Sequence, residues 1–462
     1  MITVEKIGGT SMSQFGDVLK NIMLRDPKTV YGRVYIVSAY SGVTNELLEH
    51  KKTGAAGIYA KFAKGEGYAQ AMEALLRKLQ GVNKEMAPLG LDLVKADAFL
   101  EKRFKDLQSY LDSMRHVLAS GYLSRENVLL AAREMLAAIG EAHSAFNSVE
   151  VLKARGYQAC FMDLTGFDDD ETWTIDERIH RKFQDVDPEK QIVVVTGYTK
   201  GSEGIMREFD RGYSEITFAK VAVELDADEA IIHKEFHLSS ADPELVGGPQ
   251  NVVPVGSTNY DVADQLADVG MEAIHPKAAK PIEMAGISIR LKNTFEPDHP
   301  GTLITKTYVG KQARVEVIAG TQKVTIIDIH DPRMVGAIGF DLGILEVFRK
   351  HGVSYILKST NANSITHVIS DKAAKSPFID ELKARYEQVT TQPAAVVCVI
   401  GTNISIPGVL ARAASVLAEN KINVICVSQA YRQINMQFVI DRADYKKAVA
   451  ALNQALCLNG AK

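Results

Sequence analysis

Residues 3–11, TVEKIGGTS, decide the fold class, because a short apolar strand runs directly into two adjacent glycines. Gly8 and Gly9 let the backbone approach an oxyanion and expose its N–H groups. Lys6 beside them supplies a compact charge for a transferring phosphate, with Thr10 and Ser11 following in the same loop. The segment is not a GxxxxGK[ST] P-loop, and by itself it fits an ordinary tight turn equally well.

Outward from this segment, short apolar strands alternate with helical stretches over roughly the first 300 residues, which predicts an α/β fold with a mostly parallel sheet. An apolar repeat with helical spacing from Val128 to Val149 predicts one long amphipathic helix. The charged stretch from about 50 to 125 indicates a helical insertion outside the sheet. Strands are expected at residues 3–6, 34–38, 159–163, 192–198, 229–233 and 287–292.

After Gly301 two similar units follow, opening on VTIIDIH (324–330) and AVVCVIG (395–401). Each continues with a turn, a helix and two strands, which predicts a repeated ferredoxin-like β-α-β-β-α unit. The second unit ends in a helix and lacks room for a closing strand, so strand 314–319 (RVEVIA) is expected to complete its sheet. The predicted domains are therefore 1–305, 320–390 and 391–462.

The composition argues against several classes of protein. Hydrophobic residues make up 46% and charged residues 24% of the 462-residue chain, and the net charge is −4, so no nucleic-acid or membrane partner is expected. Four widely spaced cysteines without a CxxC pair predict neither a disulfide framework nor a metal site. No apolar run approaches the ~18–20 residues that span a bilayer, and the N-terminus lacks a signal core. We therefore expect a cytoplasmic protein.

Three further motifs carry candidate chemistry. SAYSGVTN (38–45) follows a strand, where small hydroxyls can donate to a carboxylate or phosphate, although Ser41 or Thr44 also fits a helix cap. Gly140-Glu141 lies within the long helix, where a glycine costs about 1 kcal/mol and indicates a close approach. Glu141 alone also fits a partly exposed helical glutamate. DRGYSE (210–215) opens an apolar helix, where an arginine can grip a carboxylate, while Glu215 also fits a simple complement to the helix dipole.

Together these motifs make the sequence similar to the aspartate kinases over nearly the whole chain. KIGGTS resembles their KFGGTS signature, SAYSGVTN their SAxxGxTN segment, and DRGYSE stands where they have GRGGSD. MEAIHPKAA (271–279) and KNTFEPDHPGTLI (292–304) resemble their AKVLHPxA and NTxxPxxxGTxI segments. HKEFHLSSADPELVG (233–247) looks closest to the specialised aspartate kinases associated with ectoine biosynthesis.

The resemblance implies an amino-acid-kinase three-layer sandwich followed by two ACT-type units, and transfer of the ATP γ-phosphoryl group to the β-carboxylate of L-aspartate with Mg²⁺ bridging the phosphates. It implies that Glu141 holds the ammonium group of the substrate and that Arg211 holds its α-carboxylate. Glu215 replaces the family's aspartate beside the ammonium. The remaining implied contacts are Ser41 and Thr44 near the β-carboxylate, and Lys6, Gly8, Gly9, Thr10 and Ser11 at the phosphates.

The sequence departs from the family pattern at several residues that the resemblance would place in contact with the nucleotide. His233-Lys234 replaces a Thr-Asp pair, Ser239 a tyrosine, Glu244 an arginine and Glu272 a lysine. Two explanations stay open: the lineage holds ATP differently, with Lys234, His233 or His237 in new roles, or ATP use is weakened, as in a non-catalytic amino-acid sensor. A kinase of another acidic amino acid is a third reading. The resemblance also implies a homodimer or higher homo-oligomer, and an amino-acid effector at loops 331–340 and 403–408 or at their dimer interface. The sequence leaves open whether lysine, threonine or neither inhibits.

Overall fold

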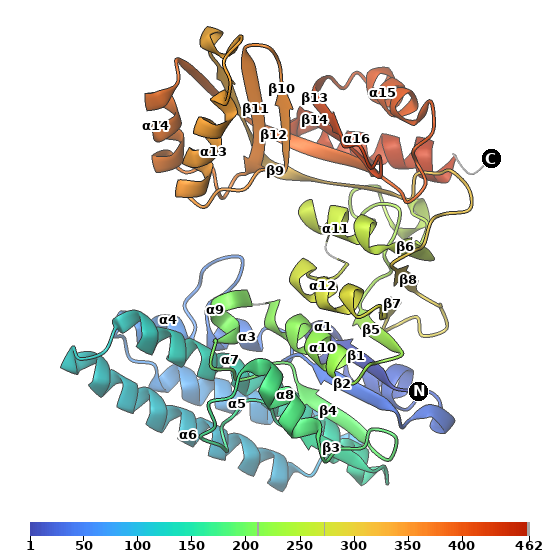
Figure 1. Cartoon of the computed structure of the whole chain (residues 1–462). Coiled ribbons are helices and arrows are strands. Elements are labelled where there is room, and N and C mark those ends of the chain that lie inside the picture. Colours follow the sequence, from blue (N-terminus) through green and yellow to red (C-terminus); the bar gives the residue numbers. More distant parts are fainter. Residues whose placement is uncertain (210–211, 272, 460–462) are drawn as a thin grey trace. The chain divides into compact units, whose positions relative to one another are not determined.

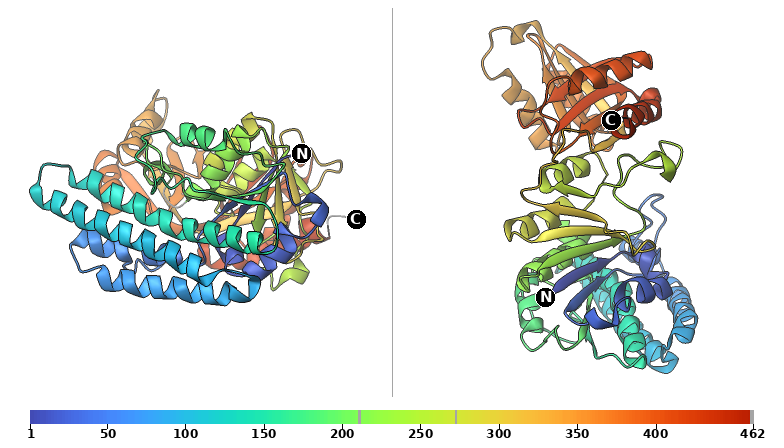
Figure 2. Two further views of the ribbon diagram at one scale, coloured as in Figure 1. Left: turned by 90° about the horizontal axis from the view of Figure 1, so that it is seen from below. Right: turned by 90° about the vertical axis from the view of Figure 1, so that its right-hand side faces the viewer.

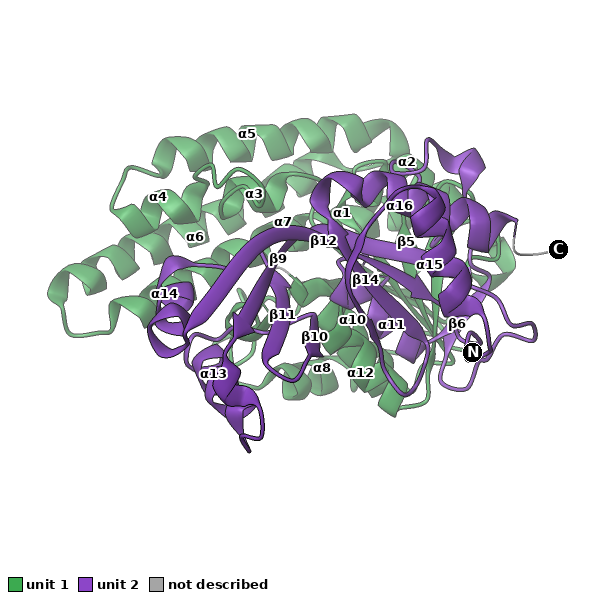
Figure 3. Cartoon of the chain, turned by 90° about the horizontal axis from the view of Figure 1, so that it is seen from above, with its two compact units in different colours: residues 1–237, 275–301 green, residues 238–274, 302–462 purple. Residues whose placement is uncertain are grey.

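The computed structural model describes residues 1–209, 212–271 and 273–459 (Figure 1). The chain divides into two compact units: residues 1–237 with 275–301, and residues 238–274 with 302–462 (Figure 3). No helix in these described ranges is long and apolar enough to cross a membrane. The predicted domain boundaries at 305, 320 and 391 stay a prediction.

The first unit contains a parallel sheet whose strands run in the order β3-β4-β2-β1-β5-β7. Buried valine and isoleucine fill the central strands, as expected for a parallel sheet covered on both faces. All six strands predicted from the sequence are present, with ends shifted by one or two residues. Their bounds are β1 Thr3–Ile7, β2 Arg33–Val37, β3 Ala159–Met162, β4 Ile192–Thr196, β5 Glu229–Lys234 and β7 Ser288–Asn293.

Helices cover both faces of this sheet, which makes the first unit a three-layer sandwich (Figure 2). Helix α7 (Arg125–Ala154), the predicted long helix, packs on β2, β3 and β4, whereas α10 (Tyr213–Glu224) and α12 (Pro276–Met284) pack on the side of β1, β5 and β7. The stretch from 50 to 125 forms α4 (Ile58–Lys64), α5 (Ala69–Met86) and α6 (Leu93–Ser120). The other helices are α1 Gly9–Met12, α2 Phe15–Val18, η1 Leu19–Met23, α3 Val43–Leu47, α8 Ile175–Phe183 and α9 Ile205–Phe209.

The second unit contains one antiparallel sheet of six strands in the order β10-β11-β9-β12-β14-β13. The two ACT-type units are therefore joined through β9 and β12, which pair along almost their whole length (Figure 3). Residues Val317–Ala319 pair with the end of β12. They also continue without a break into the residues that open the first ACT-type unit, so that both stretches form the single strand β9. The bounds are β9 Val317–His330, β10 Leu357–Thr360, β11 Ser364–Ser370, β12 Gln388–Ile400, β13 Val424–Gln429 and β14 Asn435–Asp441.

Each half of this sheet carries its own helices and core. Helices α13 (Phe340–Lys350) and α14 (Ser376–Arg385) bury one apolar cluster, and α15 (Val409–Glu419) and α16 (Tyr445–Leu452) bury a second. Segment 238–274 belongs to the second cluster and contributes β6 (Ser257–Asn259), which pairs with β8 (Thr302–Thr305), and α11 (Tyr260–Asp268). Buried Glu316 accepts hydrogen bonds from Thr402 (2.5 Å) and Thr258 (3.3 Å), which fastens β6 to the end of β12.

Candidate active site

The predicted site residues of the first unit gather at the carboxyl ends of β1, β2, β4 and β5. Parallel strands bring these ends to one edge of the sheet, which is where ligands bind in open α/β sheets. The loop after β1 carries the glycine pair, and the loop after β2 carries Ser41 and Thr44. Glu141 comes from α7, and Glu215 from the first turn of α10.

The second glycine of the pair, Gly9, is required by close packing. A Cβ atom on Gly9 would lie 2.5 Å from the Ala39 carbonyl oxygen, so only glycine fits between the loops after β1 and β2. Buried Ser11 lies 3.0 Å from the Thr294 hydroxyl and donates to Glu235 at 3.3 Å. Two residues that the sequence analysis missed, Thr294 and Glu235, therefore hold this loop, whereas predicted Thr10 is exposed.

Lys6 and Glu215 form an ion pair, with Nζ and Oε1 3.2 Å apart and both side chains largely buried. Glu215 also accepts the backbone N–H of His275 at 2.6 Å. Burial by itself would raise the pKa of Glu215, but Lys6, Lys234 and the His275 N–H together lower this pKa below its usual value. The structure thus places the predicted residues Lys6, Glu215 and Lys234 in one charged group.

Glu141 lies completely inside the first unit, with 2% of its surface exposed. The backbone N–H groups of Ala39 and Tyr198 favour its charged form, but Oε2 has no hydrogen-bond partner among the described residues. Burial raises the pKa of Glu141 well above its usual value, and Lys6 opposes this shift. Gly197, which directly follows β4, lies so near that a Cβ there would come within 2.9 Å of Oε2. Glu141 is therefore a buried acceptor with one unused oxygen and not an exposed helical glutamate.

Gly140 explains why α7 can approach the loop after β2. A Cβ on Gly140 would lie 2.6 Å from the Ala39 Cβ and 3.0 Å from Val43 Cγ1, so the close approach predicted from this glycine is present. In the same loop the Ser41 N–H donates to Ser13 Oγ at 2.8 Å. Ser38 and Ser214, which the sequence analysis did not single out, bring their hydroxyl oxygens within 3.3 Å of each other across the site.

His233 has a different position from the one considered for a nucleotide contact. Its Nε2 atom lies 2.7 Å from Glu5 Oε2, and both side chains are buried. Successive side chains of a strand point to opposite faces, so His233 faces away from the side of Lys234 and Lys6. The structure therefore assigns His233 to a buried ion pair, and Lys234 to the group around Glu215.

Two further residues that depart from the family pattern, Ser239 and Glu244, lie outside the first unit. Ser239 and Glu244 belong to the second unit, where Ser239 is buried and Glu244 is exposed. Arg211 and Glu272 lie outside the described residues. His237 Nε2 lies 3.1 Å from Glu296 Oε2.

Comparison with known proteins first defines the class. A model described as the amino acid kinase family matches residues 1–293, and one described as an ACT domain matches residues 397–456. The chain is also 45% identical over 467 residues to the aspartate kinase Ask_Ect of Stutzerimonas stutzeri, covering 99% of this chain and 97% of that protein. The chain therefore belongs to the aspartate kinases of the amino acid kinase family.

Solved structures agree on the fold. The aspartate kinase of Clostridium acetobutylicum superposes with a TM-score of 0.74 at 21% identity, covering 98% of this chain and all of that one. Aspartokinase III of E. coli, solved in complex with aspartate and ADP, superposes with a TM-score of 0.73 at 20% identity, covering 99% of this chain and all of that one. The amino-acid-kinase sandwich followed by ACT-type units, expected from the resemblance, is thereby confirmed.

Proposed function

We propose that this protein is an aspartate kinase that transfers the γ-phosphoryl group of ATP to the β-carboxylate of L-aspartate, giving 4-phospho-L-aspartate. The observation that carries the proposal is the buried Glu141 carboxylate, which has one unused oxygen beside the Lys6–Glu215 pair. A buried unpaired acceptor is costly, and a cationic ligand group relieves that cost. The family relationship indicates the substrate, and the unused oxygen of Glu141 supports binding of its ammonium group.

On the acceptor side, Glu141 would bind the ammonium group of aspartate through Oε2. Ser41 and Thr44 would donate to the reacting β-carboxylate from the loop after β2, and Arg211, at its place in the family motif, would bind the α-carboxylate. Glu215 would lie beside the ammonium and hold Lys6 in position through their 3.2 Å ion pair. The ammonium and the α-carboxylate of aspartate then meet opposite charges, and the β-carboxylate meets hydroxyl donors, which aligns it for attack.

On the donor side, Lys6 would neutralise charge on the transferring phosphoryl group, and the N–H groups around Gly8 and Gly9 would contact its oxygens. Lys234 adds a second cation at the same strand ends. The described residues contain no group of three or more His, Cys, Asp or Glu side chains that could hold a metal ion. Mg²⁺ bound with ATP would supply further charge neutralisation at the phosphates.

The sharpest test uses the ammonium group of the substrate. Acyl phosphate formed with Mg·ATP is trapped as a hydroxamate, and aspartate is compared with succinate, which lacks the ammonium. We expect the wild type to prefer aspartate strongly and Glu141→Gln to lose most of this preference. Glu150→Gln, at a partly buried position nine residues along the same helix, is the matched control and should keep the preference. Wild-type protein that yields no hydroxamate at generous aspartate would refute the kinase assignment.

Regulation follows as a second part of the proposal. The ACT-type units would bind an amino-acid effector at loops 331–340 and 403–408, and the protein would act as a homodimer or larger homo-oligomer in the cytoplasm. Titration of the kinase assay with lysine and threonine, alone and together, tests the effector. Sedimentation of the full chain tests the oligomer.

A further inference from the structure

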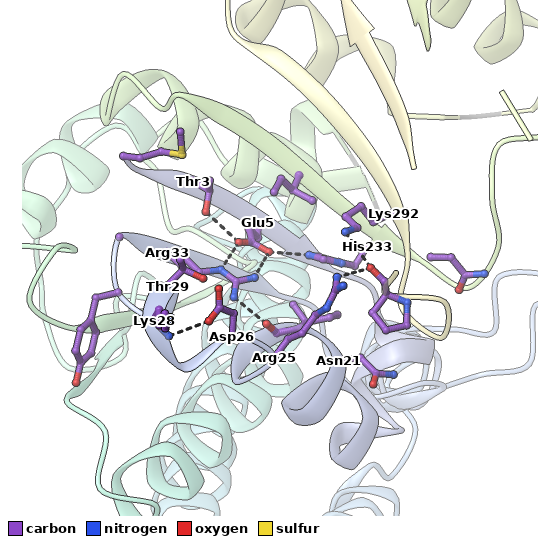
Figure 4. A pocket seen from close by; sticks show the side chains of 17 residues that line it. Thr3, Glu5, Asn21, Arg25, Asp26, Lys28, Thr29, Arg33, His233 and Lys292 are labelled. Carbon is purple, nitrogen blue, oxygen red and sulfur yellow. Dashed lines mark hydrogen bonds and ion pairs between the residues drawn. The ribbon is translucent and has the colours of Figure 1, made fainter. Parts of the chain in front are cut away.

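A second charged cavity opens on the other face of the first unit's sheet. It has a volume of about 650 Å³, and its walls come from β1, β2, β5 and β7 together with the segment after η1 (Figure 4). Glu5 and His233 line it, and both point to the face opposite Lys6. The cavity is therefore separate from the candidate active site, and its size falls in the range of about 300–1,000 Å³ that is typical of ligand sites.

Glu5 is an acidic side chain that lines this cavity, and both of its carboxylate oxygens already have hydrogen-bond partners. Glu5 accepts hydrogen bonds from Arg33 Nε (2.6 Å) and Nη2 (2.9 Å), from Thr3 (3.0 Å), and pairs with His233 Nε2 (2.7 Å). The remaining Arg33 nitrogen donates to the Ile22 carbonyl at 2.8 Å. The oxygens of Glu5 are thus occupied by Arg33, Thr3 and His233, and Glu5 acts on Lys292 through its charge without a hydrogen bond to it.

Those other cations are Lys292, Arg25 and Lys28. Lys292 donates to the Pro297 carbonyl at 3.3 Å, and among the described residues no carboxylate lies within ion-pair distance of it. Arg25 donates to the same carbonyl, and its one ion pair within the described ranges is with Asp298, whose side chain is 97% exposed. Burial lowers the pKa of Lys292, and the nearby guanidinium groups of Arg25 and Arg290 lower it further. The cavity is lined by four basic side chains, Arg25, Lys28, Arg33 and Lys292, and by two carboxylates, Glu5 and Asp26, so positive charge is in excess there.

A neighbouring cavity of about 630 Å³ extends the positive region. It shares Asn21 and Arg25 with the first cavity and adds Lys20 and Arg155, without any acidic residue in its lining. A chain with a net charge of −4 thus concentrates cations at one continuous hollow. Such concentration attracts anions and orients their oxygen atoms.

We propose that this hollow binds a small polyvalent oxyanion, bearing phosphate or carboxylate groups, with Lys292 and Arg25 as its principal contacts. The proposal goes beyond kinase activity, because the site lies on the sheet face opposite Lys6 and takes no part in phosphoryl transfer. Lysine supplies a point charge and arginine a bidentate fork, a combination suited to an anion with more than one acidic group.

The test is calorimetric titration of the full chain with pyrophosphate and, separately, with citrate, at constant ionic strength set by chloride. Four proteins are compared: wild type, Lys6→Ala, Lys292→Met and the control Lys84→Met at an exposed position outside both cavities. We expect one binding event that persists in Lys6→Ala and Lys84→Met and weakens about tenfold in Lys292→Met, the effect of one charge-assisted hydrogen bond. The anion that binds more tightly identifies the phosphate or the carboxylate source.

The outcomes separate this proposal from the kinase assignment. Pyrophosphate binding that disappears in Lys6→Ala but is unchanged in Lys292→Met would place the anion at the glycine loop and overturn the proposal. Absence of saturable binding of both anions to the wild type would overturn it as well, whatever the kinase assay shows. Arg25→Gln, at a side chain that is 40% exposed, replaces Lys292→Met if thermal melting shows that the latter does not fold.

Discussion

Gly140 offers the most direct test of how the fold shapes the site. In Gly140→Ala the new Cβ would lie 2.6 Å from the Ala39 Cβ, whereas ordinary contact begins at 3.4 Å. Helix α7 and the loop after β2 must then separate by about 0.8 Å, the difference between these distances. Ala39 has no flexible side chain that could turn away. The displacement therefore reaches the backbone that carries Ser41 and the Ala39 N–H, which favours the charged form of Glu141.

This displacement predicts the size of two effects, one on stability and one on kcat/KM for aspartate. Overpacking costs about 1–3 kcal/mol, and the better helix propensity of alanine returns about 1 kcal/mol, so the variant should be about 0–2 kcal/mol less stable. A misplacement near 1 Å costs roughly 10²-fold in rate, so kcat/KM for aspartate should fall by about that factor. Gly81→Ala is the matched control, because Gly81 lies within α5 and a Cβ there meets nothing within 4 Å. It should gain about 1 kcal/mol and keep full activity.

Urea unfolding measures the stability of both variants, and the hydroxamate assay with varied aspartate measures their kinetics. We expect Gly140→Ala to lower the free energy of unfolding and Gly81→Ala to raise it. Only Gly140→Ala should lose activity. Gly140→Ala protein with wild-type kcat/KM and a stability gain equal to that of Gly81→Ala would show that α7 does not need this close approach.

Three further predictions concern the charges of the first unit. Lys6→Met should lower kcat by about 10²–10³-fold in the hydroxamate assay, and an unchanged kcat would exclude Lys6 from the phosphate site. Because burial raises the pKa of Glu141, aspartate binding should release a proton and tighten as pH rises; calorimetry in two buffers of different ionisation enthalpy measures this release, and proton-neutral binding would contradict it. Glu5→Gln should cost about 3–5 kcal/mol in urea unfolding, because the Arg33 guanidinium keeps its charge without a carboxylate partner and His233 loses its contact with Glu5 Oε2. The folded pKa of Glu5 is depressed, so this stability is present above pH ~4.3 and the difference from wild type should shrink at lower pH; a difference that grows in acid would refute the assignment.

Local patterns in the sequence were sufficient for the elements and for part of the site. Apolar runs ending in glycine or serine predicted the strands and the loops after β1 and β2, and the unusual glycine within a helix predicted the close approach of α7. These signals are local because turn chemistry and helix propensity act over a few residues. The roles assigned to Ser41, Thr44 and Arg211 stay predictions.

The contacts that the sequence did not disclose depend on strand register. Glu5, Arg33 and His233 are far apart in the chain and meet only because β2 and β5 flank β1 with a fixed register and pleat. Thr294 and Glu235 hold the glycine loop through the same register, and nothing in their local sequence marks them. Gly197 could have been found, because a glycine directly follows the strand at 192–196, as glycines follow β1.

The shared strands β9 and β12 also set how this chain can be divided. Each strand contributes one half to each ACT-type unit, so a chain cut near residue 390 would leave one unit without its edge partner and expose a row of unpaired backbone groups. Neither ACT-type unit is therefore expected to fold alone when gene fusion or truncation separates it from the other. The two ACT-type units are therefore expected to be inherited or lost together, and expression of the whole segment from residue 302 onward should succeed only when both strands are complete.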